Sequence, residues 1–185
     1  GRRIMPASAG RTTMCPTELG YDPALAPSLR LLPIETRLQM QGLAEWRLKH
    51  DRWVEIPLDV NDADQISKAL EKVAEIRRVS LDDARALGFW HDDLAEENPV
   101  PDAEGMVEVP MWRHALINIP HPLLKQGLVI LDTPGLNAVG AEPELTVNLI
   151  PQAHAVVFIL SADTGVTRSD LSIWREHLAT STDSM

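Results

Sequence analysis

One stretch of the sequence, "GLVILDTPGLN" (127–137), combines residue types that can bind a metal ion and a phosphate. An apolar run ends at Asp132, and Gly135 follows three positions later. A carboxylate at the end of a buried strand can hold Mg²⁺ directly or through water. Because glycine lacks a side chain, its backbone N–H can approach a phosphate oxygen closely. The D-x-x-G spacing therefore predicts a loop that senses a terminal phosphate and changes shape when that phosphate leaves.

The same residues also suit an ordinary turn. "TPGL" fits a type II turn with Pro134 and Gly135 at its centre, and an aspartate before a turn is common. The surrounding sequence favours the phosphate-sensing interpretation, because an apolar strand precedes the turn and a helix and a second apolar strand follow it.

A second stretch, "GRTTMCPTEL" (10–19), offers hydroxyl groups in a glycine-containing loop. A threonine hydroxyl such as that of Thr12 or Thr13 can ligate Mg²⁺, and the backbone beside it can position a water molecule. Arg11 could meet phosphate charge. Taken alone, this stretch is more typical of a solvated loop with ordinary threonines.

The elements that must position these residues alternate in short order in the second half of the chain. Thr167 and Asp170 form a T-x-x-D capping box for a helix. Strand and helix in succession predict parallel α/β units, in which ligands bind beyond the carboxyl ends of the strands. We expect a strand or strand pair over 107–121, a buried strand over 127–132, a helix over 142–151, a buried strand over 155–160 and a helix over 167–178.

The chain before residue 107 mixes extended and helical segments. Residues 61–79 are the clearest helix, because Asn61 or Asp62 can cap it and apolar residues recur at helical spacing. Its apolar face should consist of Ile66, Leu70, Val73, Ile76 and Val79. We also expect a loop over 1–22 that leads into an extended segment, strands over 29–37 and 45–58, a short helix after Ser80 with Asp82 and Asp83 near its positive end, and a mobile acidic loop over 91–105.

Composition excludes several classes of protein. The chain has 185 residues, of which 44% are hydrophobic, which suits one domain with a real core. Its net charge of −10 argues against nucleic acid as a partner. No apolar run approaches the roughly 18 residues of a membrane span, and no signal peptide is visible. The single cysteine, Cys15, cannot form an internal disulfide, so a cytoplasmic location is expected.

Histidine and tryptophan have plainer explanations than a functional site. The six histidines show no metal-ligand spacing, so we expect structural or surface roles for them. The tryptophans are expected to anchor the core or an interface, although Trp46 and Trp53 could instead serve a partner surface.

Together the two stretches resemble the switch regions of the dynamin-like (dynamin superfamily) GTPases of the bacterial type. "MPASAGRTTMCPTELGYD" (5–22) is similar to switch I, and "LVILDTPGLN" (128–137) is similar to switch II. "AVVFILSADTGVTRSDLSIWREHL" (155–178) resembles the strand and helix that come next in that family. The resemblance is close over 5–22 and 110–178 and loose between them.

The resemblance implies an α/β fold: a partial P-loop NTPase (GTPase) domain with a mostly parallel sheet and flanking helices. It divides 1–185 into a switch I region (1–22), a helical and extended insertion (23–109), and a unit with switch II and the following strand and helix (110–185). It implies nucleotide-binding roles for Thr12, Thr13, Asp132 and Gly135, Mg²⁺ ligation by Thr13 and Asp132, and a catalytic, water-positioning role for Thr13.

Two motifs that GTP hydrolysis needs are absent from the sequence. No G-x-x-x-x-G-K-[ST] phosphate loop is present, since none of the four lysines follows a glycine. The base-reading [NT]-K-x-D motif is also missing, and "LKHD" (48–51) comes too early and begins with the wrong residue. We therefore expect the central part of a GTPase domain, with exposed strand edges where the strand of the phosphate loop would lie. Such a fragment should bind nucleotide weakly and be inactive alone.

The resemblance thus predicts an enzyme that binds and hydrolyses GTP with Mg²⁺ and couples hydrolysis to a conformational change. It also implies self-association through the GTPase domain, and membrane association of the full-length protein through regions outside this chain. Two alternatives remain open. One is a degenerate GTPase fold that binds partners without catalysis, and the other is a related ATPase, because the switches do not read the base.

Overall fold

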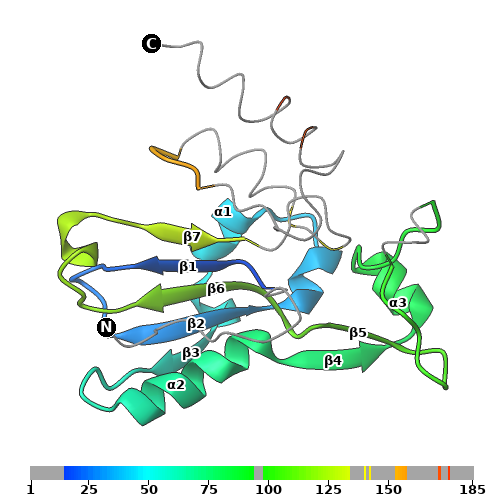
Figure 1. The fold of residues 1–185 in the computed structure, drawn as a ribbon, viewed down its shortest axis with the longest axis horizontal. Helices are drawn as coiled ribbons and strands as arrows, with labels where there is room; N and C mark the ends of the chain where they lie inside the picture. Colours follow the sequence, from blue (N-terminus) through cyan, green and yellow to red (C-terminus); the bar gives the residue numbers. More distant parts are fainter. Residues whose placement is uncertain are drawn as a thin grey trace.

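The computed structural model describes residues 15–93, 98–133, 140, 142, 153–157, 171 and 175. Within them, five strands form one sheet in the order β3-β2-β6-β1-β7 (Figure 1). The strands are β1 (Thr17–Gly20), β2 (Ser28–Pro33), β3 (Val54–Pro57), β6 (Trp112–Asn118) and β7 (Ile130–Asp132).

The pairing of these strands is mixed. Strands β1 and β6 are parallel, whereas the pairs β2–β3, β2–β6 and β1–β7 are antiparallel. The described strands therefore do not form the mostly parallel sheet that we expected. The reason is that residues 21–111 add β2 and β3 to the main sheet as antiparallel neighbours, while most of the predicted parallel units over 142–178 lie outside the described residues.

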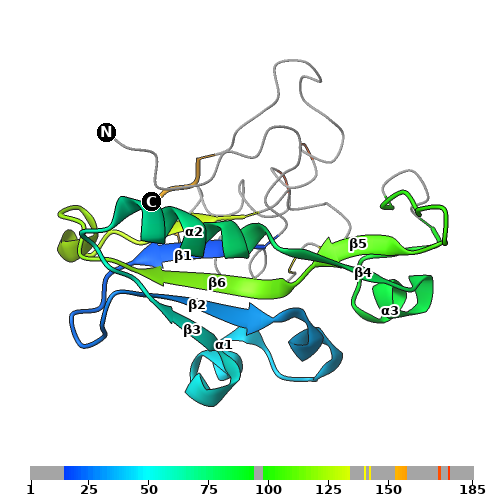
Figure 2. The same ribbon diagram turned by 90° about the horizontal axis from the view of Figure 1, so that it is seen from below.

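Helices cover both faces of this sheet. Figure 2 shows α2 (Ala63–Glu71) against one face and α1 (Leu43–Arg47) on the opposite side. Alternate residues of β2 serve the two layers, because successive side chains of a strand point to opposite faces. Leu29 and Leu31 belong to the cluster under α2, and Leu32 belongs to the cluster under α1.

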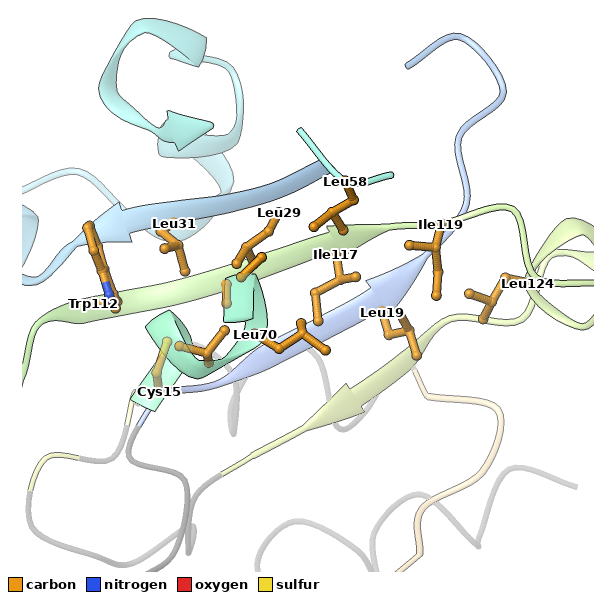
Figure 3. Packing of buried hydrophobic residues seen from close by; sticks show 13 residues of the cluster. Cys15, Leu19, Leu29, Leu31, Leu58, Leu70, Trp112, Ile117, Ile119 and Leu124 are labelled. Atoms are coloured by element: carbon orange, nitrogen blue, oxygen red, sulfur yellow. The ribbon is translucent and has the colours of Figure 1, made fainter. Parts of the chain in front are cut away.

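The layer under α2 is the largest apolar cluster of the described residues (Figure 3). Leu70 from α2 lies over Leu29 and Leu31 of β2 and Ile117 of β6. Each leucine that is fully buried here stabilises the fold by about 1.5–3 kcal/mol. Cys15, directly before β1, belongs to the same cluster.

Helix α2 begins as the sequence predicts but ends earlier. The carboxylate of Asp62 caps it by accepting hydrogen bonds from the backbone N–H groups of Asp64 and Gln65, both at 3.0 Å. After a 3-10 turn, η3 (Lys72–Ala74), the chain becomes strand β4 (Ile76–Val79), so the predicted helix over 61–79 is wrong in its last part. Pairing with a strand 30 residues away outweighs the helical spacing, and two of the four β4 residues are β-branched, which favours a strand.

Strand β4 pairs with β5 (Val107–Pro110) in a separate two-stranded sheet, beside which lies α3 (Leu81–Ala86) (Figure 1). The hydroxyl of Ser80 caps α3 by accepting from the N–H of Asp83 at 3.1 Å, which confirms the predicted short helix. These elements enclose a second small core whose members are Ile34, Val79, Ala84, Leu87, Phe89, Val107 and Val109.

The expectation of an extended segment over 45–58 is half wrong. The chain forms α1 and the 3-10 turn η2 (His50–Arg52) before it becomes β3. Trp46 and Trp53 decide this, because folding back buries both indoles beside Leu32 and Leu43. Their indole N–H groups donate to the carbonyls of Gln41 and Trp46, at 3.1 and 2.9 Å. Both tryptophans are core residues and do not form an exposed partner surface.

His114 of β6 lies in the same layer as these tryptophans. It is 1% exposed, and its ring meets the indole of Trp53 edge to face, with ring centroids 6.2 Å apart. Among the described residues, neither ring nitrogen of His114 has a hydrogen-bond partner. Burial, with smaller contributions from the charges of Arg47 and Arg113, lowers the pKa of His114 from 6.5 to about 3.

Two further elements differ from the prediction. The strand expected over 29–37 ends at Pro33 and continues as the 3-10 turn η1 (Ile34–Leu38). Strand β7, expected to be buried, is the edge of the described sheet, and Leu128, Val129 and Ile130 are 44–57% exposed. An edge strand has one pairing neighbour, here β1, so its outer side is uncovered by the described residues.

Strand β7 is preceded by the 3-10 turn η4 (Leu124–Gln126), which ends at Gly127 with a φ of 92°. Glycine suits this left-handed position because it has no Cβ. No helix in the described ranges is both long and apolar enough to cross a membrane.

Candidate functional site

The structure places Asp132 at the carboxyl end of β7, where the sheet meets the D-x-x-G segment. Asp132 is paired with Thr17, the first residue of β1, in an antiparallel register. The chain that contains "GRTT" therefore enters the sheet directly beside the acid of "DTPG". Both stretches singled out in the sequence thus meet at one edge of the sheet, although they lie more than a hundred residues apart.

The entry into β1 is held tightly. Cys15 and Thr17 are each 1% exposed, and the hydroxyl of Thr17 donates to the carbonyl of Cys15 at 3.1 Å. The backbone N–H of Ala115 on β6 donates to the carbonyl of Pro16 at 2.9 Å. Burial raises the pKa of the Cys15 thiol, so this thiol is a core group that stays protonated. The chain next to the threonine stretch therefore has a fixed position against β6 and β7.

The carboxyl group of Asp132 is electrostatically suited to a cation. Asp132 is exposed as a residue, yet desolvation of its carboxyl group raises its pKa above the ordinary value. No arginine or lysine of the described segments forms an ion pair with it, and a nearby cation would lower this pKa. A hard oxygen donor in this position fits Mg²⁺, which keeps several waters and needs only one or two protein oxygens beside a nucleotide's phosphates.

Three of the four predicted site residues lie outside the described residues: Thr12, Thr13 and Gly135. The structure therefore places only Asp132, and the roles of all four residues stay predictions. In the described segments, no group of three or more His, Cys, Asp or Glu side chains could hold a metal ion.

Sequence reasoning missed a buried ionic cluster close to this segment in the sequence. The guanidinium of Arg113 on β6 donates to both carboxylate oxygens of Glu142, with both distances at 3.0 Å. Arg37 of η1 lies 3.3 Å from the same carboxylate. A signal was available, because an arginine within the apolar strand "MWRHALIN" must find a partner once that strand is buried. The partner's identity was not readable from the sequence.

Comparison with known proteins decides the family. The family model described as "Dynamin family" matches residues 1–185, which is the whole chain. The chain belongs to the dynamin family. Its fold is accordingly that of a P-loop GTPase domain, and the α/β architecture of the described residues agrees with this membership.

A curated relative supports the same conclusion over a shorter stretch. A protein named "Bacterial dynamin-like protein" from Nostoc punctiforme is 37% identical to this chain over 49 residues. The aligned part covers 26% of this chain and 7% of the relative. Because the match spans a small part of that protein, it supports the family and carries no residue assignment.

Membership in the dynamin family agrees with the pairing of β1 and β7. This family is a GTPase family, and the strand pair β1–β7 joins the two segments that resemble its switches. Within the described residues, 21–111 form the connection between the parallel strands β1 and β6 and add β2 and β3 to the sheet. The long stretch between the switch-like segments is thus built into the main sheet.

Proposed function

We propose that this chain is part of a domain that binds GTP and hydrolyses it with Mg²⁺. Family membership supports the GTPase assignment. The single structural observation that carries the proposal is the pairing of Asp132 with Thr17, because it brings the acid of "DTPG" beside the chain that follows "GRTT". Two switch segments must meet at one phosphate if both are to sense it.

In this proposal, Thr13 and Asp132 would hold Mg²⁺, and the backbone of Gly135 would contact the terminal phosphate. Thr12 and Thr13 would contribute to nucleotide binding, and Thr13 would also position the attacking water. The metal ion, when bound, would neutralise charge that develops on the phosphate oxygens. Asp132 would contribute a carboxylate that is deprotonated at neutral pH, since a divalent cation favours the charged form.

We further propose that the chain by itself binds nucleotide weakly and is inactive. The 185 residues contain no phosphate loop of the G-x-x-x-x-G-K-[ST] type and no [NT]-K-x-D motif. Backbone N–H groups of a phosphate loop and its lysine supply most of the contacts to the β- and γ-phosphates. Without them, the switches could sense a phosphate but could not hold it. Titration of the chain with labelled GTP and Mg²⁺ should show no micromolar affinity.

The activity is tested in the full-length protein with Thr13→Ala and Asp132→Asn. Thr13→Ala should abolish GTP turnover while leaving most of the nucleotide affinity. Asp132→Asn should also lower turnover, because a neutral amide oxygen would hold Mg²⁺ less strongly than a carboxylate. Glu55→Gln is the matched control, because Glu55 is an exposed carboxylate on β3, at the other edge of the sheet. Unchanged hydrolysis in Thr13→Ala would reject the assignment.

Binding of GTP and ATP to the full-length protein separates the alternatives. A full-length protein that binds neither GTP nor ATP would be a degenerate GTPase fold that acts as an interaction module. Preference for ATP over GTP would make it a related ATPase.

We propose in addition that the full-length protein is cytoplasmic or peripheral at a membrane, and that it associates with itself through the GTPase domain. Sedimentation with and without a GTP analogue tests the self-association.

A further inference from the structure

Two arginines from distant parts of the chain converge on one carboxylate. Arg113 of β6 binds Glu142 through two parallel N–H···O contacts of 3.0 Å, and Arg37 of η1 lies 3.3 Å from it. The side chains of Arg37, Arg113 and Glu142 are 11%, 6% and 4% exposed. A paired arrangement of this kind fixes both distance and orientation, because the planar guanidinium matches the geometry of a carboxylate.

The same cluster holds the backbone two residues earlier. Arg37 donates to the carbonyl of Gly140 at 2.7 Å. Gly140 has a φ of 87°, and a Cβ added there would lie 2.1 Å from the ring of Phe89. The guanidinium of Arg37 also lies over that ring, 4.6 Å from its centroid. Only glycine fits this position. Gly140 is held by the hydrogen bond from Arg37 and lies against the Phe89 ring, and Glu142 is held by its ion pairs.

Other contacts of the two arginines lead into the insertion. Arg37 donates to the carbonyl of Leu87 at 3.1 Å. Arg113 donates to the carbonyls of Thr36 and Gln41, at 3.2 and 3.4 Å. The cluster therefore connects three parts of the molecule: the insertion near residues 36–41 and 87–89, the strand β6, and the residues Gly140 and Glu142. We call Arg37, Arg113 and Glu142 the arginine clamp.

Glu142 follows the D-x-x-G segment closely in the sequence, so the clamp lies near the end of that segment. Asp132 is fixed at one end by the β1–β7 pairing, and Gly140 and Glu142 are fixed ten residues or fewer further along. The D-x-x-G segment, residues 132–135, lies in the interval between Asp132 and Glu142. Both ends of the interval are thus tied to the sheet or the insertion, and the clamp sets where its second end lies.

We propose that Arg37 and Arg113 are positioning residues that fix the far end of the phosphate-sensing segment and couple it to the insertion. This inference rests on the proposed GTPase function. The directional ion pair is the reason for preferring this role to simple core packing. Apolar residues of similar volume would often fill such a site with equal or greater stability, whereas they would not define one position of the chain.

The test uses the full-length protein and the variant Glu142→Gln, with GTP turnover measured as kcat and KM. The expected result is a kcat at least 10-fold lower with a KM for GTP within about threefold of the wild type, because the nucleotide is held elsewhere. Arg113→Lys should lower kcat as well, since lysine cannot form the paired contact. Glu104→Gln is the control, because Glu104 forms an exposed ion pair with Arg78 at the far end of β4.

A triple variant separates positioning from stability. Arg37→Met and Arg113→Met together with Glu142→Leu replace all three charged side chains of the clamp by apolar ones, so that no buried charge is left without a partner, and should restore the thermal stability that Glu142→Gln loses. If the clamp positions the segment, kcat stays low in this triple variant. If the clamp is only part of the core, kcat returns to the wild-type value, and that result would overturn the proposal.

Hydrogen exchange gives a readout that does not depend on hydrolysis. Peptides that cover 131–142 should exchange faster in Glu142→Gln, while peptides from β2 and β6 keep their protection. Unchanged exchange over 131–142 would overturn the anchoring role. If the wild-type protein does not hydrolyse GTP, the proposed function fails and the exchange result alone decides the anchoring. If Glu142→Gln does not fold, Arg37→Lys carries both measurements, because it keeps the charge while losing the stacked contact with Phe89.

Discussion

Acidification should destabilise the fold through the buried imidazole of His114. Its pKa is lowered from 6.5 to about 3 in the folded state, chiefly by burial. The unfolded chain therefore takes up a proton near pH 6.5, whereas the folded chain does so only near pH 3. A group of this kind leaves the free energy of unfolding intact above the unfolded pKa. Stability is lost as the pH falls from that value toward the folded pKa.

The expected magnitude follows from the shift. Each pH unit between 6.5 and about 3 lowers the free energy of unfolding by about 1.4 kcal/mol. At pH 4.5 the loss from His114 alone is about 3 kcal/mol, and the full shift corresponds to about 5 kcal/mol. A domain is typically stable by about 5–15 kcal/mol, so a loss of this size should be readily measurable.

The measurement is urea unfolding followed by tryptophan fluorescence at several pH values between about 7.5 and 4.5. His114→Leu removes the titrating group and the two ring nitrogens that have no hydrogen-bond partner among the described residues. The difference in unfolding free energy between this variant and the wild type should grow in the variant's favour by about 1.4 kcal/mol per pH unit below 6.5. His91→Gln is the control, because His91 is exposed.

The outcome that refutes this reasoning is a constant difference. If wild type and His114→Leu lose stability in parallel as the pH falls, within about 0.5 kcal/mol, then burial does not keep His114 neutral. If the pH dependence instead disappears in His91→Gln, the effect belongs to His91 and its assignment to His114 is wrong.

Two further substitutions test the packing that the structure describes. Leu70→Ala should destabilise the fold by about 2–5 kcal/mol in urea unfolding, because Leu70 is 3% exposed on the face of α2 that packs on the sheet, whereas Leu48→Ala, at a residue 80% exposed, should cost no more than about 0.5 kcal/mol. Gly140→Ala should cost more than Gly105→Ala, because both glycines have positive φ but a Cβ meets the Phe89 ring only at Gly140. The excess at Gly140 should vanish in a Phe89→Ala background, and an excess that persists there would contradict the assigned clash.

Local signals in the sequence were sufficient for several elements. The start of α2 and the short helix after Ser80 were recognisable, and Asp62, one of two candidate caps, bonds to backbone groups two and three residues away. The D-x-x-G and Thr-Thr stretches identified the family, which the match over the whole chain confirms. Of the four predicted site residues, the structure places Asp132 at the end of a strand, as expected.

Other features were beyond local reasoning. The helical spacing of Ile76 and Val79 with Leu70 was real, yet both residues belong to β4, because a partner strand was available at 107–110. Trp46 and Trp53 turned a predicted strand into a helix and a 3-10 turn by burying against Leu32. In each of these cases a contact with a distant segment outweighed a local preference, which amounts to a few tenths of a kcal/mol per residue.

The sequence by itself determined the residue types that the proposed chemistry needs, the starts of two helices and the family, because these depend on short spacings along the chain. Tertiary structure alone decided that β1 lies between β6 and β7, that β7 is exposed at the edge of the described sheet, and that Arg37 and Arg113 meet Glu142. Those outcomes depend on burial and on pairing between residues that can lie more than a hundred positions apart. A buried charge must find a partner, but which partner it finds is settled only when the chain has folded.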